Sequence, residues 1–289
     1  MIKVNKDFAK IPQSLISTKN KKAFESNIQA GGYVCTDTCY KGTDVKKQLE
    51  AIYHRKCAFC EKDLLDTTRA VEHFRPKRKS SKAVSKCKAD FSYYWLALSW
   101  ENLLLACTQC NTSKGNCFDV QNARATYQQE TFEEIHTKAA TYQESEKPML
   151  INPEVEDPKW LFYFDTNAQI HPINNHARMK YTIDICNLNR VELVGSRLII
   201  LNDFRKKLDL DFNLFAIKPD FDFFQNTIQD FVEKTKEQNA YFAWRNFILA
   251  HIEEFIFKQN NSQFNVIVKT AFLKYIKNSF HGNSNPIQN

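Results

Sequence analysis

The chain has 289 residues, with 40 lysines and arginines against 33 aspartates and glutamates, and a net charge of +7. No run reaches the roughly 18 apolar residues of a membrane helix, so we expect no membrane partner. Only six glycines are present and no Walker motif occurs, which argues against a nucleotide-binding phosphate loop. Because the first residues lack the apolar segment of a signal peptide, a cytoplasmic protein is expected.

The first half of the chain predicts a mixture of short helices and strands. A helix begins with Asp44 as its N-cap. Apolar residues flank Glu72 and His73, and a proline follows three residues later, so a short strand that runs into a loop is predicted. The other predicted elements are an aromatic-rich helical turn or two over 91–100, a buried strand over 103–106 and a helix after Asn111.

The second half predicts helices. A polar stretch after about residue 120 leads to Asn189, which we interpret as the N-cap of a capping box. Apolar residues then recur at helical spacing over 194–208, 224–232, 244–256 and 264–275. Fourteen of the 23 phenylalanines lie after residue 200. They fit either a helical core, which is the favoured interpretation, or a surface for a partner protein.

Two Cys-x-x-Cys pairs carry the metal prediction: Cys57 with Cys60, and Cys107 with Cys110. Two such knuckles complete a tetrahedral all-sulfur shell without an open position, which is typical of a structural zinc. Disulfides are the alternative, but the odd number of cysteines and the missing signal peptide argue against them. The remaining cysteines are interpreted as ordinary thiols: Cys35, Cys39, Cys87, Cys117 and Cys186.

A basic run follows the predicted strand that ends at His73. Residues 75–88 contain seven lysines and arginines and no acidic residue, which equals the net charge of the whole chain. Such a run is usually a solvated loop, but its position beside Glu72 and His73 suits phosphate binding. We expect phosphate contacts from Arg75, Lys77, Arg78, Lys79, Lys82 and, further along the chain, Lys114.

These motifs together resemble a known family. Cys-x-x-Cys, then Glu-His-x-x-Pro, then Asn-Leu, then Cys-x-x-Cys-Asn-x-x-Lys-Gly resembles the HNH superfamily, whose active site is a ββα-metal finger. The stretches 72–77, 94–97, 100–107 and 110–116 are similar to the PtuB-like nucleases of the Septu and retron-linked anti-phage systems. The resemblance extends from about residue 45 to about residue 205.

The resemblance implies an α+β fold and a catalytic site. The core would be a zinc-stapled ββα-metal nuclease with flanking helices, over residues 1–130, and residues 131–289 would be a linker and a mainly helical, Phe-rich region that docks a partner. His73 would be the general base, Asn102 would brace the loop that orients it, and Glu72 and Asn111 would hold one divalent ion. Glu72 stands where many HNH sites have Asp, and Asn111 where many have His. These oxygen ligands favour Mg²⁺ or Mn²⁺ over zinc at the catalytic position.

The implied activity is endonucleolytic hydrolysis of phosphodiester bonds in anti-phage defence. DNA is the favoured substrate, because this chemistry does not need a 2′-hydroxyl, and RNA such as tRNA is the alternative. The implied partner is a PtuA-like ABC-type ATPase that gates the nuclease, with a retron reverse transcriptase and its msDNA as a further partner in some systems. A different class of function also fits the motifs: a catalytically silent zinc-knuckle module that binds nucleic acid or protein.

Overall fold

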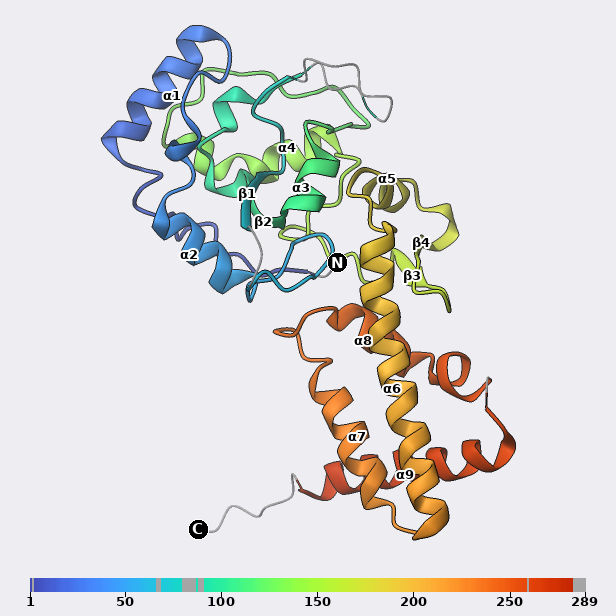
Figure 1. The fold of residues 1–289 in the computed structure, drawn as a ribbon. Coiled ribbons are helices and arrows are strands. Elements are labelled where there is room, and N and C mark those ends of the chain that lie inside the picture. The colour runs from blue at the N-terminus through green and yellow to red at the C-terminus, as the bar shows by residue number, and fades with distance from the viewer. Residues whose placement is uncertain (2, 66–68, 80–86, 88–90, 259, 283–289) are drawn as a thin grey trace, which may run out of the picture. The chain divides into compact units, whose positions relative to one another are not determined.

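A computed structural model describes residues 1, 3–65, 69–79, 87, 91–258 and 260–282 (Figure 1). The chain divides into two compact units. The first comprises residues 1–163 and 170–190, and the second comprises residues 164–169 and 191–289. Helices and two small two-stranded sheets make this an α+β fold, as the sequence predicted.

Local signals set the first helices. Helix α1 (Thr18–Ala30) begins where the Ser17 side chain accepts a hydrogen bond from the Asn20 amide, and ends at Gly31 in the left-handed conformation that glycine adopts readily. Helix α2 (Thr43–Ile52) begins before the predicted cap, Asp44. The carboxylate of Asp44 instead accepts from the amide and hydroxyl of Ser14, at 2.8 and 2.5 Å, so this residue ties α2 to the preceding loop.

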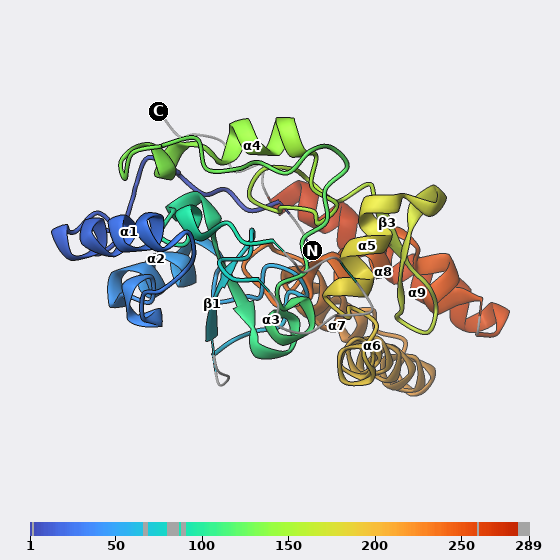
Figure 2. The same ribbon diagram turned by 90° about the horizontal axis from the view of Figure 1, so that it is seen from above.

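A ββα unit lies at the centre of the first compact unit. Strands β1 (Arg69–His73) and β2 (Leu103–Cys107) pair antiparallel, with Glu72 opposite Leu104 and His73 opposite Leu103. Every residue of β2 is buried, which explains its apolar sequence. Helix α3 (Thr108–Lys114) follows β2 directly and packs against both strands (Figures 1 and 2). The two strands and the following helix predicted from the sequence are therefore confirmed.

Other elements complete the first unit around this centre. The aromatic-rich segment forms short 3-10 turns over 94–96 and 100–102. The further regular elements are α4 (Ala139–Glu146), β3 (Phe162–Phe164), β4 (Ile170–Pro172) and α5 (Ala177–Ile185). The compact units divide the chain near residue 190, and most of the stretch 131–190 lies in the first unit. The functional boundary at residue 130 stays a prediction.

The second unit is helical, as its periodicity predicted. Its elements are α6 (Val191–Ile217), α7 (Asp222–Glu233), α8 (Phe242–Ala250), a π-helical turn (Glu253–Phe257) and α9 (Ser262–Gly282). Helix α6 packs against α7, α8 and α9, and the rings of Phe204 and Phe231 stack 3.8 Å apart. None of the phenylalanines after residue 200 whose side chains are described is exposed. The described rings are buried or half-buried, which fits the core interpretation, and a partner surface stays a prediction.

The predicted capping role of Asn189 is wrong. Its side-chain amide accepts from the backbone N–H of Ile170 at 2.8 Å and donates to the carbonyl of Ile170 at 2.9 Å. Helix α6 begins at Val191, so the residue directly before the helix is Arg190, and the Asn189 side chain pairs with the strand instead. Asn189 therefore joins β4 to the segment that precedes α6. Among the described helices, none is both long and apolar enough to cross a bilayer.

Candidate functional site

Four cysteines from two separate segments meet in the first unit. Cys57 and Cys60 lie in the loop after α2, Cys107 ends β2, and Cys110 lies in the first turn of α3. All four are buried, and their sulfur atoms lie within 4.8 Å of one another. The fold thus brings the two Cys-x-x-Cys motifs together in one cluster, as the sequence predicted.

The sulfur geometry fits a tetrahedral metal ion. Zinc–sulfur bonds of about 2.3 Å require sulfur atoms about 3.8 Å apart. The Sγ atoms of Cys60 and Cys107 are 3.8 Å apart, and the Cys110 amide donates to Cys107 Sγ at 3.3 Å. The four cysteines could therefore hold a structural metal such as zinc.

His73 lies at the end of β1, between the two knuckles in the sequence. Its imidazole is 4% exposed, packs edge-on against the ring of Tyr40 and makes a 2.9 Å hydrogen bond from Nε2 to the carbonyl of Ala97. Burial lowers the pKa of His73 well below its usual range, and the charges of Lys77 and Lys114 lower it further. The imidazole is therefore neutral, and the Ala97 contact requires the hydrogen on Nε2, which leaves Nδ1 as the basic nitrogen.

Glu72 forms a buried ion pair with Lys114. The Lys114 ammonium contacts Glu72 Oε1 at 2.6 Å and the carbonyl of His73 at 2.8 Å. Burial raises the pKa of the Glu72 carboxyl, and the Lys114 charge opposes that shift. The lysine of the Lys-Gly motif is thus a neighbour of the candidate metal ligand. Gly115 follows with a φ of 51° and a ψ of −130°, a conformation that favours glycine.

Asn102 clamps the chain that leaves β1. Its side chain accepts from the Arg75 amide at 2.7 Å and donates to the carbonyls of Arg75 and Leu96, at 3.0 and 3.1 Å. Its own carbonyl accepts from the Phe74 amide. These contacts fix the backbone on both sides of the turn that follows His73. Asn111, the other predicted metal ligand, is half-buried on α3 next to Cys110.

The six cationic side chains predicted to contact phosphates differ in their exposure. Arg75 is 1% exposed and pairs with Glu146 at 2.8 Å, and Lys114 is fully buried against Glu72. Both cations pair with internal carboxylates in this structure, and their role as phosphate contacts stays a prediction. Among the others, Arg78 and Lys79 are exposed, Lys77 is half-buried, and Lys82 lies outside the described residues.

The half-buried Lys77 belongs to an aromatic cluster that covers His73. Its ammonium donates to the Tyr40 hydroxyl at 2.8 Å and lies 5.3 Å from the ring centre of Tyr33. The guanidinium of Arg78 also lies over the Tyr33 ring, at 4.7 Å. Neither tyrosine was singled out from the sequence, because nothing in the spacing of residues 33–40 relates them to residues 73–78. Only the fold places them there.

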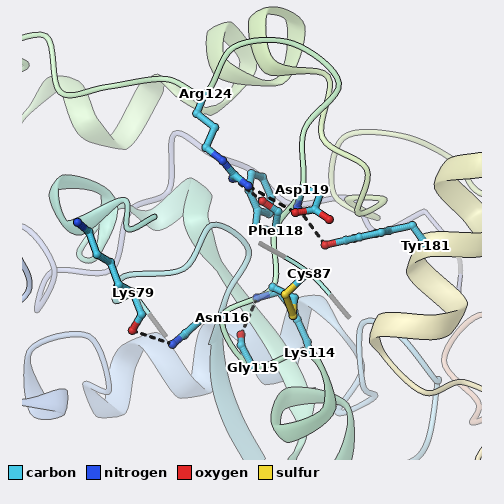
Figure 3. Close-up of a disulfide and its surroundings, with 10 residues drawn as sticks. Lys79, Cys87, Lys114, Gly115, Asn116, Phe118, Asp119, Arg124 and Tyr181 are labelled. Atoms are coloured by element: carbon cyan, nitrogen blue, oxygen red, sulfur yellow. Dashed lines mark hydrogen bonds and ion pairs between the residues drawn. A yellow bond between two sulfur atoms is a disulfide. The ribbon is translucent and has the colours of Figure 1, made fainter. Parts of the chain in front are cut away.

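Cys87 and Cys117 form a disulfide, although the sequence analysis interpreted both as ordinary thiols. Cys87, in the basic run, is bonded to Cys117, three residues after α3 (Figure 3). Their Cα atoms are 5.5 Å apart, in the range that a disulfide needs. Beside this bond, the side chain of Asn116 donates to the Lys79 carbonyl at 3.4 Å (Figure 3). A sequence separation of 30 residues gave no sign of this pairing.

Comparison with known proteins agrees with this arrangement of motifs. The chain is similar to the Septu protein PtuB. It is 31% identical to PtuB of Bacillus mycoides (strain KBAB4) over 170 residues, which cover 58% of this chain and 54% of that protein. It is 25% identical to PtuB of Bacillus thuringiensis over 171 residues, which cover 54% and 46% of the two chains. The match thus spans about half the length of these relatives.

A second Septu protein also matches. The chain is 23% identical to PtuA of Bacillus mycoides (strain KBAB4) over 160 residues, which cover 55% of this chain and 21% of that protein. No family profile matches the chain. No solved structure matches it either. The comparisons therefore support a PtuB-like Septu protein.

Proposed function

We propose that this chain is a metal-dependent HNH endonuclease that acts in anti-phage defence. The observation that carries the proposal is a neutral, oriented histidine that follows a buried carboxylate at the end of β1, in a ββα unit that also carries two of the four clustered cysteines. Similarity to the Septu protein PtuB supports the defence role.

In this proposal His73 is the general base. Hydrolysis of a phosphodiester needs a side chain that can accept a proton from water near neutral pH. The bond from Nε2 to the Ala97 carbonyl orients the ring, so that Nδ1 takes the proton of the attacking water. Asn102 hydrogen-bonds to the backbone N–H and C=O of Arg75 and so holds the turn that follows His73. Its proposed role is therefore to position the ring.

Glu72 and Asn111 would hold the catalytic Mg²⁺ or Mn²⁺. A carboxylate and an amide oxygen suit these ions. Lys114 contacts Oε1 of Glu72 at 2.6 Å, so a metal ion at this carboxylate would share it with the lysine ammonium. A divalent ion held there would stabilise charge on the phosphate and on the leaving 3′ oxygen, and the products would carry a 5′-phosphate and a 3′-hydroxyl.

DNA is the proposed substrate, and the exposed cations of the basic run are its proposed contacts. Arg78 and Lys79 are exposed, and Lys77 donates to the hydroxyl of Tyr40, whose ring packs against His73. Such side chains give affinity for the phosphate backbone with little base readout. RNA remains the alternative substrate, because neither the basic run nor the proposed chemistry selects for a deoxyribose.

We also propose that a PtuA-like ABC-type ATPase gates this nuclease. The exposed fractions of Glu72 and His73 are 6% and 4%, so a phosphodiester can reach them only after the surrounding side chains move. If a partner drives this opening, the nuclease stays inactive in the absence of that partner. Among the described residues of the second unit, the large apolar side chains that are exposed are aliphatic. They offer the proposed docking surface: Val191, Ile199, Leu210, Ile217, Val266, Leu273 and Ile276. A retron reverse transcriptase with its msDNA stays a predicted additional partner.

The same closed geometry favours a second candidate function. A carboxylate neutralised by Lys114 and a covered histidine also suit a catalytically silent module that binds nucleic acid or protein. In that case the four-cysteine site and the ββα unit would be retained for binding alone. Activity measurements separate the two functions directly.

The test is cleavage of supercoiled plasmid and of total RNA by the purified chain with Mg²⁺ or Mn²⁺, with and without the partner ATPase. We expect His73→Ala to lose at least the ~10²–10⁴-fold rate enhancement of a general base. His54→Asn is the matched control, because His54 is an exposed histidine of the same unit in a left-handed conformation that asparagine tolerates. Cleavage that survives in His73→Ala would refute the role of His73, and a chain inactive under all conditions would favour the silent module.

A further inference from the structure

Arg190 contacts three of the four cysteines of the metal site. Its Nη1 lies 3.5 Å from Cys110 Sγ, and its Nη2 lies 3.6 Å from Cys60 Sγ and 3.8 Å from Cys107 Sγ. Nη1 also donates to the carbonyl of Asn187 at 3.1 Å, which holds the guanidinium in place. These contacts place one cation against sulfur atoms that come from two different segments of the chain.

The metal site needs such a cation. Four thiolates around a divalent ion carry a formal charge of −2, and all four cysteines are buried. A buried net charge is costly unless it is paired and hydrogen-bonded. A guanidinium remains protonated throughout the pH range of proteins, so the Arg190 side chain supplies a permanent positive charge next to these sulfur atoms.

The shape of the side chain explains why arginine occupies this position. A guanidinium presents its N–H groups in a planar fork of fixed geometry, whereas the lysine ammonium is a compact point charge. The fork lets Nη1 and Nη2 reach different sulfur atoms at the same time. Partners of this kind, one shell outside the ligands, change metal affinity by about 10–100-fold when they are removed.

We propose that Arg190 is the counter-ion of the four-cysteine metal site and sets its affinity for zinc. Its hydrogen bonds withdraw electron density from Cys60, Cys107 and Cys110 and offset the negative charge of the loaded site. This role does not depend on nuclease activity. It adds to the two knuckles a fifth residue, located 80 positions after Cys110, that the cysteine pattern does not contain.

The experiment measures the zinc affinity of the full chain by competition with a chromophoric chelator. Arg190→Met removes the charge and the donors, and we expect it to bind zinc about 10–100-fold more weakly. Arg190→Lys, which keeps the charge but loses the fork, should lie between Arg190→Met and the parent. Arg178→Met is the matched control, because Arg178 is a partly buried arginine of the same unit that pairs with Glu156 and contacts none of the four sulfurs.

A spectroscopic readout separates this role from a general loss of fold. In the cobalt-loaded chain, loss of the hydrogen bonds to sulfur should move the thiolate-to-cobalt charge-transfer band of Arg190→Met to longer wavelength. If Arg190→Met does not fold, Arg190→Gln provides a second neutral variant with an amide donor. Zinc affinity of the neutral variant equal to that of the parent, or an equal loss in Arg178→Met, would overturn the proposal.

Discussion

Replacing Lys114 with methionine tests the buried ion pair beside His73. The Lys114 and Glu72 side chains are 0% and 8% exposed, and their charged atoms are 2.6 Å apart. At an effective dielectric constant of about 20, this separation corresponds to roughly 6 kcal/mol of attraction, which offsets the cost of burying both charges. Lys114→Met removes the attraction and leaves the carboxylate of Glu72 buried without its partner.

We expect Lys114→Met to lower the free energy of unfolding by about 3–5 kcal/mol at neutral pH. For a unit of this size, that loss corresponds to a fall in Tm of roughly 6–20 °C. The deficit should shrink as the pH falls from about 7 to about 5. The reason is that the pKa of Glu72, already raised by burial, rises further without Lys114, so that the folded variant takes up a proton before the unfolded chain does.

Thermal and urea unfolding of four variants measure this effect. Glu72→Gln/Lys114→Met should recover much of the loss, because it removes the unpaired charge. Together with Lys114→Met and the single variant Glu72→Gln, it completes a double-mutant cycle that gives the coupling energy. Lys47→Met, at an exposed position of α2, is the control and should stay within about 0.5 kcal/mol of the parent. A Lys114→Met variant within about 1 kcal/mol of the parent would refute the reasoning from burial.

Three further predictions concern the metal site, a buried histidine and the basic run. Cys107→Ser should lose zinc and lower the Tm of the first unit, which metal analysis and calorimetry would check; unchanged zinc content would contradict the site. Burial lowers the pKa of His136 to about 4, so the unfolded chain binds a proton first and the parent should lose up to about 3 kcal/mol of stability as the pH falls from about 6.5 to about 4. His136→Gln should lack this loss, and an identical pH profile would count against it. Neutralising Lys77, Arg78 and Lys79 should weaken binding to all DNA sequences alike and reduce the salt slope, by about one unit for each phosphate that the variant no longer binds; a sequence-specific loss would point to base readout.

The sequence by itself determined the local elements of the candidate site. A spacing of two residues lets both cysteines of a pair face one metal ion, and this depends only on the local chain. The spacing was therefore enough to predict the four-cysteine cluster. The apolar stretch around Glu72 and the run of leucines after Asn102 predicted β1 and β2, and helical periodicity predicted the helices of the second unit. Each of these signals lies within a few residues along the chain.

Only the tertiary structure decided which charged groups are available. Lys114 and Arg75 looked like phosphate ligands, but the fold buries them against Glu72 and Glu146. Asn189 carried the signal of a helix cap, and the fold instead pairs its side chain with Ile170.

The disulfide, the Tyr40 ring over His73 and the Arg190 contacts with the sulfurs likewise join segments that are far apart in the sequence. A side chain binds whichever partner lies closest once the chain has folded, because the cost of burying a charge or a polar group depends on its neighbours in three dimensions. Local spacing therefore identified the four cysteines that could hold a metal ion, and long-range packing brought Tyr40 to His73 and Arg190 to the sulfur atoms.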